Sequence, residues 1–82
     1  MEDKATLAAA AGRAAAWATT AQGTLDTARA NLRSTLRAAW IAGTTPTQAT
    51  VDTQADAVNR AEAELYAANA LVSELSQSVN YA

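Results

Sequence analysis

A seven-residue repeat of apolar side chains from Val51 to Val79 limits the possible folds of this chain more than any other feature of its sequence. It forms an a/d pattern with Val51, Val58, Leu65, Val72 and Val79 at the a positions and Gln54, Ala61, Ala68 and Leu75 at the d positions. Since a strand alternates every second residue, this spacing predicts one long helix. Its apolar seam is narrow and needs a partner helix to cover it.

The first half of the chain carries a matching repeat. Its two rows are Ala11, Ala18, Leu25, Leu32 and Ala39, and Leu7, Ala14, Ala21, Ala28, Thr35 and Ala42. The phase runs undisturbed past Gly12 and Gly23, although each glycine costs about 1 kcal/mol relative to alanine in a helix. We therefore predict one helix over about residues 4–42. A break near Gly23, in a Thr-rich stretch, would give three helices instead.

The segment Gly43–Pro46 predicts the turn between these helices. Gly43 suits a left-handed C-terminal cap, Thr45 suits an N-cap, and Pro46 suits the first helical position. Gln48 would complete a capping box with Thr45. We expect a turn over 43–45 and a second helix over about 46–79. So short a turn makes the helices antiparallel neighbours, and the predicted fold is an all-α two-helix hairpin forming a single domain, residues 1–82.

Charge and side-chain size agree with this pairing. Residues 13–37 carry four arginines against one aspartate, and residues 52–74 carry five carboxylates against one arginine, so the two arms have opposite charge. With the turn near Gly43, the numbers of two residues that face each other across the antiparallel pair add up to about 86. In this register large seam residues mostly face small ones. In that register Trp17 and Leu71 occupy facing flank positions, and we predict that they touch.

A two-helix seam leaves other apolar groups uncovered, and the chain is short. With 82 residues and no Cys, disulfides cannot supply the missing stability, so oligomerisation or a partner protein is expected to complete the fold. Nine residues form the predicted protein interface: Trp17, Leu36, Trp40, Ile41, Ala63, Tyr66, Ala67, Ala70 and Tyr81. The alternative for Trp40 is a local role, folded over the turn as a plug.

No residue pattern indicates catalysis. The chain has no His and no Cys, which excludes zinc fingers and Glu-x-x-His di-iron sites, and its serines lack a general base. We expect no enzymatic activity, cofactor, metal or small-molecule substrate. Arg29, Arg33 and Arg37 recur every four residues and form a possible basic patch. Because the other arm is acidic, a salt-bridged face is favoured over nucleic-acid binding.

Trp40 and Gly43, at the turn of a helical hairpin, resemble the Trp-x-Gly motif of the small secreted WXG100 proteins. The sequence here is Trp-Ile-Ala-Gly, and Ala70 follows Tyr66 where that family's export signal has an acidic residue. The resemblance implies a secreted partner protein that forms a four-helix bundle with a second chain. Pro46 and the chain length are similar to the needle subunits of type III secretion systems, which are also helical hairpins.

These observations predict a non-enzymatic structural or adaptor subunit that packs its hairpin into a larger protein assembly. A virion, a secretion apparatus and a homo-oligomeric bundle all fit. The alternatives are a WXG100-like secreted partner protein and a small nucleic-acid-binding regulator. The sequence shows neither a signal peptide nor a membrane-spanning segment, so the cytoplasm, a virion and non-classical secretion all stay open as locations.

Overall fold

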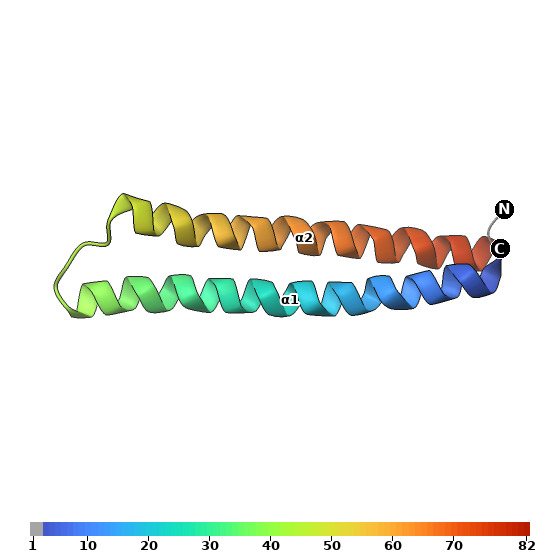
Figure 1. Ribbon diagram of the computed structural model, residues 1–82, viewed down its shortest axis with the longest axis horizontal. Coiled ribbons are helices and arrows are strands. Elements are labelled where there is room, and N and C mark those ends of the chain that lie inside the picture. Colours follow the sequence, from blue (N-terminus) through green and yellow to red (C-terminus); the bar gives the residue numbers. More distant parts are fainter. Residues whose placement is uncertain (1–2) are drawn as a thin grey trace.

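A computed structural model describes residues 3–82 and shows two long helices lying side by side (Figure 1). Helix α1 covers Lys4–Ile41 and helix α2 covers Gln48–Tyr81, and the described residues contain no strand. The two helices run antiparallel, with the turn at one end of the rod and both chain termini at the other (Figure 1). The rod measures 60 × 16 × 12 Å. The predicted helical hairpin is therefore confirmed.

Helix α1 begins where its first turn is capped. The side chain of Asp3 accepts a hydrogen bond from the backbone N–H of Thr6, with 2.7 Å between the two atoms. This contact satisfies one of the N–H groups that a helix leaves without a partner at its start. The helix then continues through both Gly12 and Gly23 without interruption. The three-helix alternative is therefore wrong.

Gly43 ends α1 in the predicted left-handed conformation, with φ of +77°. The N–H of Gly43 donates to the carbonyl of Trp40 at 3.1 Å, and the N–H of Thr44 donates to the carbonyl of Ala39 at 2.9 Å. This pair of bonds defines a Schellman motif, which satisfies carbonyls at the helix end. The Thr44 hydroxyl also donates to the carbonyl of Ala39, at 3.1 Å.

Helix α2 begins two residues later than predicted. Its N-cap is Thr47, whose side-chain oxygen accepts from the N–H of Thr50 at 3.2 Å, and Pro46 lies outside the helix. The predicted cap at Thr45 is wrong: Thr44–Thr47 connect the two helices, and α2 starts at Gln48. The amide of Gln48 donates to Asp52 at 2.8 Å instead of completing a capping box.

The predicted seam forms the interface between the helices. Every predicted a and d position is buried or half-buried except Ala42, which lies just beyond the end of α1. The buried core of the described residues consists of Ala14, Ala21, Leu25, Ala61 and Ala68. Four of these five are alanines, so the helices can approach closely, but little apolar area is removed from water.

Candidate interaction surfaces

The hairpin has two long flanks, one on each side of the seam. Since a and d positions face the other helix, the neighbouring heptad positions lie along these flanks. We call one the Trp17 flank; it includes Arg13 and Trp17 on α1 and Glu64, Ala67, Leu71 and Glu74 on α2. We call the other the Leu36 flank; it includes Arg29, Arg33, Leu36 and Trp40 on α1 and Asp52, Glu62 and Tyr66 on α2.

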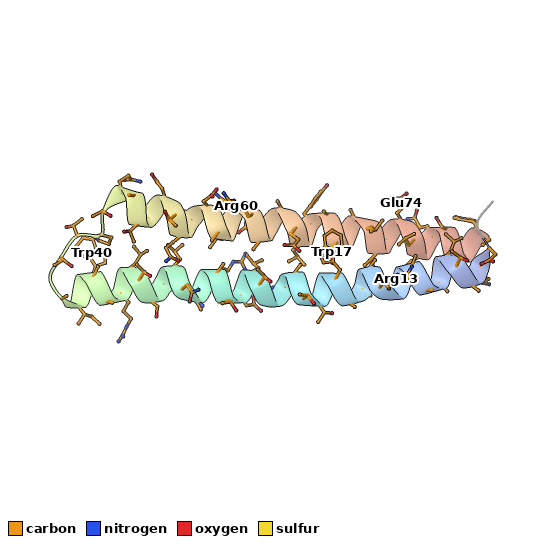
Figure 2. The ribbon with its side chains drawn as sticks, in the orientation of Figure 1. Arg13, Trp17, Trp40, Arg60 and Glu74 are labelled. Atoms are coloured by element: carbon orange, nitrogen blue, oxygen red, sulfur yellow. The ribbon has the colours of Figure 1, made fainter. Side chains whose placement is uncertain are left out.

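Trp17 bridges the two helices on its flank. Its indole N–H donates to a carboxylate oxygen of Glu64 on α2, with 2.8 Å between Nε1 and Oε1. Figure 2 shows Trp17 lying between the helices, and 37% of its surface stays exposed. Leu71, on the same flank, is 37% exposed as well. Their predicted contact stays a prediction, but both are only partly covered by the hairpin.

Glu64 was not predicted as the partner of Trp17. Both residues occupy g positions, and g positions of antiparallel helices face each other. The signal was therefore available in the heptad phase. The predicted partner Leu71 is also a g residue, one heptad further along α2, so phase alone could not decide between the two.

Leu36, Trp40 and Ile41 lie near the turn end of the rod. Leu36 is half-buried, whereas Trp40 is 64% exposed and Ile41 is 69% exposed. Figure 2 shows Trp40 beside the turn. Trp40 therefore lies against the turn (Figure 2) with nearly two-thirds of its surface in contact with solvent. Its indole therefore stays available to another molecule.

The other predicted interface residues lie elsewhere on the rod. Tyr66 and Tyr81 are almost fully exposed, and Ala63, Ala67 and Ala70 are exposed on α2. At about 1.5 Å per residue, Trp17 and Trp40 lie roughly 35 Å apart along α1. The structure therefore does not gather the nine predicted residues into one surface. It distributes them over two flanks, the outer face of α2 and the two ends.

The possible basic patch is only partly salt-bridged across the helices. Arg29 pairs with Glu62 on α2, with 3.4 Å between Nη2 and Oε1, as expected for arms of opposite charge. Arg33 and Arg37 form no ion pair with any residue in the range 3–82. Asp56 pairs with Arg60 of its own helix, with 2.7 Å between Oδ2 and Nη2, and not with an arginine of α1.

Among residues 3–82, no three His, Cys, Asp or Glu side chains come together in a cluster that could hold a metal ion. The pKa of Asp3 lies below its usual value because the backbone N–H and the side chain of Thr6 both donate to its carboxylate. Asp3 is a helix cap, so this pKa reflects structure and not chemistry.

Neither helix, over the part of the chain that the structure describes, contains a segment long and apolar enough to cross a membrane.

Fold and surfaces together define the class of the protein: an all-α antiparallel helical hairpin with a small alanine core and aromatic side chains exposed along its length. No protein-family model, no curated protein and no solved structure matches this chain.

Proposed function

We propose that the protein is a non-enzymatic structural or adaptor subunit that packs its hairpin against other protein chains in a larger assembly. One observation carries this proposal: the hairpin exposes more large apolar side chains than it buries. Within residues 3–82 the buried core contains a single large side chain, Leu25, while six large apolar side chains are substantially exposed: Trp17, Trp40, Ile41, Tyr66, Leu71 and Tyr81.

This imbalance has an energetic consequence. Burial of apolar area is the main term that favours folding, at about 25 cal/mol per Å². A domain of this size has little core to offset the conformational entropy of ordering its chain. Contact with further chains would cover the exposed indoles and phenols and add the missing burial. Aromatic residues are also the side chains most enriched at protein interfaces.

The native mass of the protein in extracts of the cells that produce it tests this proposal. Size-exclusion chromatography with antibody detection should place the chain in a complex well above the 8.4 kDa of one copy. Elution as a single copy, in fresh extract and after chemical cross-linking in intact cells, would contradict the proposal. The test does not depend on whether the partner is a second copy or a different chain.

The turn supports a second candidate function, a WXG100-like partner protein that forms a four-helix bundle with a different chain. The supporting observation is that Trp40 is exposed beside the turn, only three residues before Gly43 with its positive φ. This candidate predicts a complex of two different small chains in equal amounts. Mass spectrometry of the purified native complex distinguishes it from a homo-oligomer, which contains one chain only.

A further inference from the structure

We propose that the partner covering the Trp17 flank is a second copy of this chain, packed side by side and parallel, with turn end beside turn end. The inference rests on the proposed function and specifies its partner. It would create a four-helix bundle in which α1 of each copy lies against α2 of both copies. Every neighbouring pair of helices in such a bundle is antiparallel, as in common four-helix bundles.

Two opposite charges on the Trp17 flank lie at the same level of the rod. Residues of α1 and α2 whose numbers add up to about 86 share a level. Arg13 therefore lies at the level of Glu74, and Figure 2 shows Arg13 on α1 and Glu74 on α2 at about the same point along the rod. Within residues 3–82 neither takes part in an ion pair. Each charge is thus free to meet a charge on another molecule.

A two-fold axis running along the rod brings these charges together. It places α1 of one copy over α2 of the other at the same level, so that Arg13 faces Glu74 of the second copy, and the contact occurs twice. Trp17 then faces Leu71 and Ala67 of the second copy. Both Trp17 and Leu71 are 37% exposed and would be covered by this contact. Opposite charges and apolar surfaces are therefore matched by one operation.

The antiparallel arrangement fails on charge. If one copy were reversed about the level of Trp17, α2 would lie over α2 of the second copy. Glu74 of one copy would then come close to the level of Glu64 of the other, and two carboxylates would oppose each other twice. Like charges facing each other disfavour a complex, so the parallel arrangement is preferred.

The size of the flank suits a stable dimer. The rod is 60 Å long, and its two smaller dimensions are 16 and 12 Å. A face of these dimensions approaches the roughly 800 Å² that each partner buries in a standard protein interface. Small residues, Ala10 and Thr24, occupy the g positions one heptad before and one heptad after Trp17 on α1. They allow close approach of the second hairpin on either side of Trp17.

Charge reversal followed by mixing tests the pairing. Sedimentation equilibrium of the purified full chain should show a dimer. Arg13→Glu alone and Glu74→Arg alone should each weaken dimerisation by about tenfold or more, because each creates two repulsive contacts. An equimolar mixture of the two variants should restore it, since in the mixed dimer both contacts again join an arginine to a glutamate. An ion pair within one chain cannot be restored by mixing.

The Leu36 flank offers a matched control. Arg33 and Asp52 lie at one level there, as Arg13 and Glu74 do on the Trp17 flank. Arg33→Glu and Asp52→Arg, separately or mixed, should leave the dimerisation constant within about twofold. A chain that sediments as a monomer at all concentrations, or a dimer that mixing does not restore, would overturn the proposal. A chain that is monomeric when pure but part of a complex in the cell would overturn it while leaving the proposed function intact.

Energy transfer between dyes checks the orientation. The chain has no cysteine, so Ala82→Cys provides a unique labelling site at the open end of the rod. Mixed donor and acceptor chains should show strong transfer in a parallel dimer, in which the two labels lie side by side. Weak transfer in a proven dimer would refute the parallel arrangement.

Discussion

At the scale of single residues, the alanines of the seam allow the two helices to pack closely but bury little apolar area. Ala68 is completely buried, and Ala21 and Ala61 nearly so, at positions where most coiled coils carry leucine or valine. A methyl group lets two backbones approach closely and costs no side-chain entropy. It also buries little area. The few residues that cap the helices or adopt an unusual conformation therefore have a large influence on stability.

Asp3 should make stability depend on pH in the acid range. Its pKa in the folded state is below 3.8, the usual value, so its carboxylate stabilises the fold above that pH. The contribution is lost as pH falls through the lowered pKa. Asp3→Ala should therefore lower the melting temperature more at pH 7 than at pH 2. Circular dichroism melts of the two proteins give this difference directly.

Asp3→Asn is the matched control for that experiment. The amide oxygen can still accept the bond from the N–H of Thr6 but does not titrate in this range. The variant should keep most of the cap at both pH values. If Asp3→Ala costs as much at pH 2 as at pH 7, the ionised carboxylate is not the stabilising form.

Gly43 and Gly23 should respond in opposite ways to alanine. Gly43 has a φ of +77°, which strains any residue with a Cβ, and we expect Gly43→Ala to destabilise by about 1 kcal/mol. Gly23 lies inside α1 with no atom within 4 Å of an added Cβ, so Gly23→Ala should stabilise by about 1 kcal/mol. Urea unfolding of both variants at equal protein concentration shows whether each substitution raises or lowers the free energy of unfolding. Destabilisation by Gly23→Ala would indicate a close contact at this surface.

At the scale of elements, the start of α2 shows how local signals compete. Thr45 with Pro46 and Thr47 with Gln48 both lie at possible helix starts. The chain uses Thr47, whose hydroxyl also donates to the hydroxyl of Thr50 at 2.9 Å. The connection must span the distance between two packed helices after Gly43. In the structure the connection runs from the end of α1 at Ile41 to the start of α2 at Gln48.

The two threonines therefore make a paired prediction. Thr47→Ala should destabilise the hairpin by about 1 kcal/mol, because the N–H of Thr50 loses its acceptor. Thr45→Ala should change stability by less than about 0.5 kcal/mol, since a substitution away from such features has little effect. Thermal unfolding of both variants measures the contrast. A larger loss of stability for Thr45→Ala than for Thr47→Ala would mean that α2 is capped by Thr45.

At the scale of the whole molecule, one large side chain holds the centre of the seam. Leu25 is 3% exposed and is the only buried residue, within residues 3–82, larger than alanine. The two contacts between polar side chains of α1 and α2, Trp17 with Glu64 and Arg29 with Glu62, lie on opposite flanks at about its level. Leu25 is therefore expected to be the main apolar contact that joins the two helices.

Leu25→Ala should destabilise the protein by about 3 kcal/mol, a large share of the stability available to so small a domain. Leu36→Ala, at a half-buried position on a flank, should cost about 1 kcal/mol because less area is lost. Urea unfolding monitored by circular dichroism separates the two. If both variants lost the same unfolding free energy, Leu36 would stabilise the protein as much as Leu25 does. That result is expected if another chain covers Leu36.

The sequence by itself determined the repeat, the continuity of the first helix and the left-handed cap at Gly43. These features depend on spacing and on local conformational preference, and both are present in every short segment of the chain. Only the tertiary structure decided the start of α2 and the choice of Glu64 as the partner of Trp17. Each depends on where the second helix lies in space, and neighbouring residues of similar chemistry could have served equally well. The nine predicted interface residues were exposed or partly exposed as expected, but their separation along a 60 Å rod became apparent only in three dimensions.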